Sequence, residues 1–129
     1  MLKIFLRRGT TVALIAVLLS FNTLAQNGKY TVVRFAKGKS SKTLTGKLKN
    51  TDDVNHFELN AKNGQTMNVR LTGGGNARFS IYIKGTTTTL EDASGVRSWS
   101  GELTDGGGYV ITVYSQRGAA NYSLNVSIR

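Results

Sequence analysis

Apolar and polar residues alternate along most of this chain after residue 26, and no stretch there keeps a helical period over several turns. The last segment is the clearest case, because Tyr122, Leu124 and Val126 alternate with asparagine and serine. A period of two places such residues on opposite faces of a strand. The pattern predicts about eight strands, near residues 30–35, 43–48, 54–61, 65–71, 77–83, 97–103, 108–115 and 120–128.

Glycine-rich turn signals separate these strands, at Asn63-Gly64, at residues 73–76 and at residues 104–108. Short strands with one apolar and one polar face are typical of sandwiches, in which each sheet buries one face. We therefore expect an all-β, single-domain β-sandwich of about eight mostly antiparallel strands, of jelly-roll or immunoglobulin-like form. Residues 85–96 fit either a loop or a weak edge strand.

The two strands at the end of the chain are separated by only a few residues, which favours a hairpin. Ser115-Gln116-Arg117-Gly118 would then form its tip, with an arginine presented to solvent. A soluble turn and a binding loop both fit this pattern.

The first 25 residues have the layout of a secretory signal peptide. A basic start (Lys3, Arg7 and Arg8) precedes an apolar run and the small-residue segment ending at Ala25. A membrane anchor is the alternative, but the apolar run is short for a bilayer. We expect residues 1–25 to be removed, leaving residues 26–129 as a periplasmic or secreted domain with no membrane anchor. The chain has no cysteine, so packing and hydrogen bonds must stabilise this domain without disulfides.

Charge adds a constraint on partners. Residues 26–129 contain 14 lysines and arginines against 7 aspartates and glutamates, a net charge of +7. The basic residues are scattered, without the interleaved aromatics of a nucleic-acid surface, so we expect no nucleic-acid partner. Such a surface is suited to anionic envelope polymers or an acidic cleft on another protein.

The residues needed for catalysis or metal binding are scarce. His56 is the only histidine, and nucleophilic hydrolysis usually requires a base beside the nucleophile. Asp52-Asp53 and Glu91-Asp92 could each supply oxygens to calcium, but neither has an EF-hand spacing, and solvated turns explain them as well. We expect no catalytic residues, no metal site and no cofactor, which argues against an enzyme.

Three segments occur in a familiar order: "VRFAKGKSSKTLTGKL", "FELNAKNGQTMNVRL" and "SWSGELTDGGGYVITVYSQRGAANYSLNV". Together they resemble the periplasmic inhibitors of g-type (goose-type) lysozyme. They are also similar to the wider group of bacterial β-sandwich domains related to the pre-peptidase C-terminal domain. The resemblance extends over residues 30–129.

This resemblance implies that the domain blocks a lysozyme by inserting loops into the acidic substrate cleft. The loop before the last strand would supply Arg117, with Gln116 and Ser115 as hydrogen-bonding groups and Gly118 allowing the turn. An arginine fork can bind a cleft carboxylate through two parallel hydrogen bonds. A second loop, at residues 50–55, would contribute Thr51, Asp52, Asp53 and Asn55, although it lacks the tyrosine associated with that loop in the family.

A second function stays open, namely a non-catalytic envelope module that contacts peptidoglycan or another glycan. Exposed aromatic residues such as Tyr82, Trp99 and Tyr114 would then stack against sugars. Trp99 also fits core packing, which is the common role of a lone tryptophan in a small sandwich. The sequence leaves the lysozyme class and the oligomeric state open.

Overall fold

The computed structural model describes residues 28–129. These residues form eight strands: β1 (Lys29–Val32), β2 (Ser41–Leu48), β3 (Val54–Ala61), β4 (Thr66–Gly73), β5 (Ala77–Ile83), β6 (Ser98–Glu102), β7 (Gly107–Ser115) and β8 (Ala120–Ile128). All eight predicted strands are confirmed. The expected signal peptide, residues 1–25, lies outside the described residues. In the part of the chain that is described, no helix is long and apolar enough to cross a membrane.

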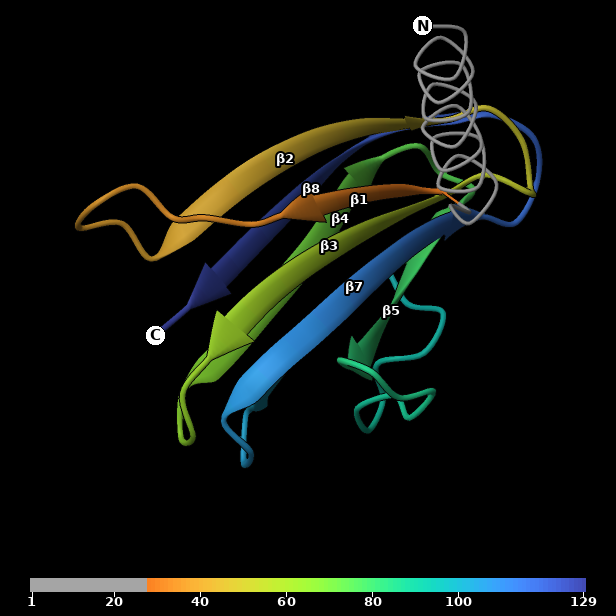
Figure 1. Cartoon of the computed structure of the whole chain (residues 1–129). Coiled ribbons are helices and arrows are strands. Elements are labelled where there is room, and N and C mark those ends of the chain that lie inside the picture. Colours follow the sequence, from red (N-terminus) through yellow and green to blue (C-terminus); the bar gives the residue numbers. More distant parts are fainter. Residues whose placement is uncertain (1–27) are drawn as a thin grey trace, which may run out of the picture.

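The strands form two four-stranded sheets that pack face to face (Figure 1). Sheet A has the order β1-β3-β7-β5, and sheet B has the order β2-β8-β4-β6. All pairs are antiparallel except β1 and β3, which run parallel. The predicted all-β sandwich of mostly antiparallel strands is therefore confirmed.

Consecutive strands always lie in different sheets. The odd-numbered strands of the described chain form sheet A and the even-numbered strands form sheet B. The expected hairpin between the last two strands is therefore wrong, because β7 pairs with β3 and β5 while β8 pairs with β2 and β4. Residues 116–119 cross from one sheet to the other.

The core lies between the sheets, where the apolar faces of the alternating strands meet. Phe79, Ile81, Ile111, Val113 and Leu124 are completely buried there. Such burial of apolar surface is the main term that stabilises a small domain without disulfides. Trp99 packs against the edge of this core, and its indole Nε1 donates a 2.8 Å hydrogen bond to the carbonyl oxygen of Glu91, as the core-packing interpretation expects.

Residues 85–96 are an irregular segment that covers the edge of β5. Its contacts include isolated bridges from Val96 to Phe79 and from Thr89 to Tyr82. The amide of Ile81 also donates to the carbonyl of Ala93, at 2.9 Å. A covered edge is protected from pairing with other chains. The open question about this segment is thus resolved as a loop that partly pairs with β5.

Candidate functional site

Three connections between the sheets meet at one end of the sandwich, which we call the three-loop end: residues 49–53, 74–76 and 116–119. Strand pairing brings them together, because Tyr114 and Ser115 at the end of β7 lie opposite the first residues of β3 and β5. The first residue of β8, Ala120, lies opposite the end of β2. Figure 1 shows the yellow β2–β3 connection beside the blue β7–β8 connection. The two loops singled out from the sequence are therefore neighbours.

The β7–β8 loop is held in one shape by Ser115. This residue is only 3% exposed, and its hydroxyl lies 2.7 Å from the carbonyl oxygen of Gly118 and 3.1 Å from that of Arg117. The amide of Gln116 donates to the carbonyl of Asn76 in the neighbouring loop, at 2.9 Å. Gly118 has a φ of +62°, a left-handed conformation that glycine adopts without strain. The loop is thus fixed by its own residues and by the loop beside it.

Arg117 stands exposed at the tip of this fixed loop, with Gln116 and Gly118 exposed on either side. Within residues 28–129 the only ion pair joins Lys84 and Glu58. The guanidinium of Arg117 therefore points to solvent without a carboxylate partner from the described chain. Its charge is available to another molecule.

The β2–β3 loop is a tight turn closed by its own side chains. The carboxylate of Asp53 accepts a 2.9 Å hydrogen bond from the amide of Lys49, and the side chain of Asn50 accepts one from the amide of Asp52, also at 2.9 Å. Thr51 and Asp52 are exposed. Such side-chain-to-backbone bonds are typical of Asx turns. Asp53 therefore shapes the loop, while Thr51 and Asp52 face solvent.

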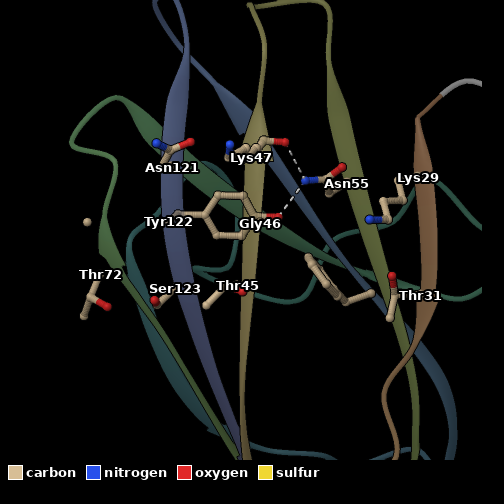
Figure 2. A pocket seen from close by; sticks show the side chains of 12 residues that line it. Lys29, Thr31, Thr45, Gly46, Lys47, Asn55, Thr72, Asn121, Tyr122 and Ser123 are labelled. Carbon is tan, nitrogen blue, oxygen red and sulfur yellow. Dashed lines mark hydrogen bonds between the residues drawn. The ribbon is translucent and has the colours of Figure 1, made fainter.

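Asn55 differs from the other predicted site residues, because it is 6% exposed and lies inside β3. Its Nδ2 donates to the hydroxyl of Tyr122, at 2.7 Å, and to the carbonyl of Lys47, at 3.2 Å. Figure 2 shows both bonds reaching from β3 to sheet B. Asn55 therefore ties the strands that flank the two predicted loops and does not itself face a partner.

Tyr122 is the residue that the sequence did not single out for this site. It lies opposite Gly46 of β2 and Gly73 of β4, and its ring extends over Gly46 (Figure 2). Burial raises the pKa of the Tyr122 phenol above its usual value, the Asn55 hydrogen bond opposes this, and the negative charge of Asp53 adds to the rise. The signal available in the sequence was Gly46, a glycine inside a predicted strand, since such a glycine often marks a place where another group approaches the backbone closely.

The third loop, residues 74–76, was not predicted to contribute. Arg97 holds it, because its guanidinium donates to the carbonyl oxygens of Gly73 and Gly74, at 2.8 and 3.0 Å. The same group reaches the carbonyls of Ala77, at 3.0 Å, and Leu71, at 3.4 Å. One half-buried guanidinium thereby satisfies the carbonyl oxygens of the turn between β4 and β5.

A hollow of about 670 Å³ lies below these loops, and Figure 2 views it from close by. Threonine, asparagine and lysine side chains surround Tyr122 in its wall; they include Lys29, Lys47, Thr45, Thr72 and Asn121. Four exposed cations therefore lie near this end, namely Lys29, Lys47, Lys49 and Arg117. They outnumber the two carboxylates there, those of Asp52 and Asp53. The arrangement favours an acidic or polar partner surface.

Other features considered for chemistry lie elsewhere. His56 is on the outer face of sheet A, where its Nδ1 is 2.9 Å from the hydroxyl of Thr112 and its ring stacks on Tyr30. Among the described residues, no group of three or more histidine, aspartate or glutamate side chains is placed to hold a metal ion.

Comparison with solved structures gives a clear relationship. The described fold is similar to the periplasmic inhibitor of g-type lysozyme (PliG) from Aeromonas hydrophila, with 31% sequence identity, a TM-score of 0.68, and coverage of 81% of this chain and 100% of that one. The PliG of Salmonella Typhimurium is 23% identical, with a TM-score of 0.63 and coverage of 79% and 99%. No protein-family model matches the sequence, and no curated protein matches it.

A third structure is more distant. The pre-peptidase C-terminal domain of a Bacillus anthracis collagenase is 12% identical, with a TM-score of 0.53 and coverage of 81% of this chain and 96% of that domain. It shares the sandwich fold alone.

Proposed function

Since this chain belongs to the family of periplasmic inhibitors of g-type lysozyme, we propose that it inhibits a g-type lysozyme by inserting the three-loop end into the substrate cleft. The observation that carries this proposal is Arg117, an exposed guanidinium with no carboxylate partner within residues 28–129, on a loop whose backbone is fixed by Ser115 and Asn76. The protein would act as a binding partner and not as an enzyme.

The chemistry of a muramidase cleft suits this arginine. Glycoside hydrolases use a pair of carboxylic residues on either side of the bond that they cleave. A guanidinium can bind one carboxylate through two parallel hydrogen bonds, which add direction to the attraction between the charges. Arg117 would thus occupy the cleft where the sugar normally lies, with the Gln116 amide hydrogen-bonding to groups that otherwise hold the substrate.

The rigidity of the loops favours tight binding. Ordering a loop on association costs free energy, and a loop that is already fixed avoids that cost. The β7–β8 loop is tied to the β4–β5 loop through Gln116 and Asn76, while Asn55 ties β3 to β2 and to β8. Thr51 and Asp52 would contact the rim of the cleft from the neighbouring loop.

The location of the relatives supports an envelope role. The Aeromonas and Salmonella proteins are both described as periplasmic. We propose that residues 1–25 direct export in the same way and that residues 26–129 meet the lysozyme in the periplasm or outside the cell.

The test is an inhibition assay with residues 26–129 and purified lysozymes of the g, c and i types. We expect inhibition of the g type and a rise in the inhibition constant of at least tenfold on Arg117→Ala, corresponding to about 1.4 kcal/mol. Arg70→Ala is the matched control, because Arg70 is also exposed but lies within β4, away from the loops. An inhibition constant unchanged by Arg117→Ala would reject the loop assignment, and absence of inhibition of any g-type enzyme would reject the function.

A further inference from the structure

A groove of about 500 Å³ runs along the outer face of sheet A, and the lysozyme proposal does not use it. We call it the aromatic groove. Strand register puts Tyr30, His56 and Thr112 in one row across β1, β3 and β7. Val110 and Tyr82 form part of the next row. Its lining residues are Tyr30, His56, Tyr82, Ile83, Gly85, Thr86, Thr87, Val110 and Thr112.

Tyr30 gives this groove an unusual surface. Its side chain is 59% exposed, although it is a large aromatic residue on a strand. Its ring stacks on His56 with the centroids 4.5 Å apart and the planes 26° from parallel. This stacking holds the ring in a defined orientation on the sheet. Tyr30 therefore presents a fixed aromatic surface to solvent.

Apart from the His56 imidazole, the polar side chains of the groove carry hydroxyl groups. Thr86, Thr87 and Thr112 supply hydroxyl oxygens, of which that of Thr86 already bonds to the Ile83 carbonyl and that of Thr112 to His56. Tyr82 supplies a phenol on the opposite side from Tyr30. Among the described residues that line the groove, none is a lysine, arginine, aspartate or glutamate. The nearby charges of Glu58 and Lys84 are paired with each other at 2.9 Å. The described lining of the groove thus offers aromatic rings and hydroxyls but no carboxylate, ammonium or guanidinium group, which disfavours an ionic ligand.

We propose that the aromatic groove binds an uncharged pyranose chain, such as the β-linked amino-sugar strand of peptidoglycan. A pyranose ring has an apolar C–H face that packs on an aromatic ring and an edge of hydroxyls that hydrogen-bond. Tyr30 supplies the ring for stacking, and the threonines with Tyr82 supply partners for the hydroxyls. This site is separate from Arg117, so the protein would hold its position on the wall by one surface and block the lysozyme by another.

Titration with tetra-N-acetylchitotetraose (called chitotetraose below), an uncharged chain of four N-acetylated amino sugars, tests this directly. We expect chemical-shift changes at Tyr30, Thr87 and Thr112, and binding about tenfold weaker for Tyr30→Ala, which removes one stacked ring. Tyr30→Phe keeps the ring and should bind as the unchanged protein does. Arg117→Ala should also bind normally, since it lies outside the groove. Thermal unfolding of each variant checks that it is folded.

Co-sedimentation with purified peptidoglycan sacculi provides the second measurement. Sedimentation that persists at high salt and falls with Tyr30→Ala supports the proposal. Sedimentation that disappears at high salt and does not depend on Tyr30 would indicate adsorption of a basic protein and overturn it. Binding to sacculi without any binding to chitotetraose would assign recognition to the peptide stems and overturn it as well.

Discussion

Asn55 and Tyr122, which are 67 positions apart, join the two sheets through a 2.7 Å hydrogen bond from the Asn55 amide to the Tyr122 hydroxyl. Both side chains are nearly inaccessible, at 6% and 4% exposure. Asn55 follows the β2–β3 loop, and Tyr122 follows the β7–β8 loop. The relative position of the two proposed binding loops therefore depends on one buried polar contact.

Removal of this contact should destabilise the protein. Asn55→Ala leaves the Tyr122 hydroxyl and the Lys47 carbonyl without their donor, and we expect the free energy of unfolding to fall by about 1–3 kcal/mol. A double-mutant cycle with Tyr122→Phe, measured by urea unfolding, should give a coupling energy of about 1 kcal/mol. Asn125→Ala is the control, because its bond to Thr43 is exposed. Simple additivity of the two buried substitutions would contradict this account.

The raised pKa of Tyr122 makes the contribution of that residue depend on pH. In the unfolded chain the phenol ionises near 10.0, whereas burial raises its pKa in the folded protein. As the pH rises, the phenol of the unfolded chain therefore loses its proton before that of the folded protein. The contribution of Tyr122 to the free energy of unfolding is complete below about pH 10 and falls as the pH rises further. Tyr122→Phe lacks this titration. The stability difference between the two proteins should shrink above pH 10 in urea unfolding, and a constant difference would count against the assignment.

Gly46 should not tolerate a side chain. A Cβ at this position would lie against the Tyr122 hydroxyl and 2.5 Å from its Cζ. We expect Gly46→Ala to cost about 1–3 kcal/mol, because the buried ring must shift. Gly75→Ala is the matched control, since an added Cβ there meets nothing within 4 Å. Equal melting temperatures for the two variants would show that the ring moves freely.

Arg97 should not be replaceable by lysine. Its guanidinium reaches four carbonyl oxygens around the β4–β5 loop, and a single ammonium nitrogen does not reproduce that fork. Arg97→Lys should lower the free energy of unfolding by about 1–3 kcal/mol. Arg70→Lys, on an exposed position of β4, should change it by less than about 0.5 kcal/mol. If Arg97→Lys is as stable as the unchanged protein, the fork is not important.

Ser115 should affect inhibition without touching the lysozyme. Ser115→Ala removes the hydroxyl that holds the carbonyls of Arg117 and Gly118, so the loop must be ordered on binding. We expect the inhibition constant to rise by roughly threefold to tenfold, less than for Arg117→Ala. The combined variant should show less than the sum of the two effects, since a loose loop matters only when it carries the arginine.

The strands could be predicted from the sequence because period-two alternation is a local property, as residues 120–128 illustrate. The pairing of the strands could not be predicted, because the alternating faces of β7 and β8 fit a hairpin as well as two strands in separate sheets. The exposure of Arg117, Thr51 and Asp52 was predictable from turn chemistry. The burial of Asn55 and Ser115 was not predictable, since it depends on contacts with residues that are distant in sequence, such as Tyr122.

The alternation of strands between the sheets has a consequence for how the chain folds. Within residues 28–129 no strand pairs with the next one, so every pairing closes a long loop, and high contact order predicts slow folding. The last strand, β8, occupies an inner position between β2 and β4. Sheet B therefore stays incomplete until residues 120–128 have emerged. A chain that leaves a ribosome or crosses a membrane from its N-terminus would therefore keep sheet B open to proteases and chaperones until residues 120–128 have emerged.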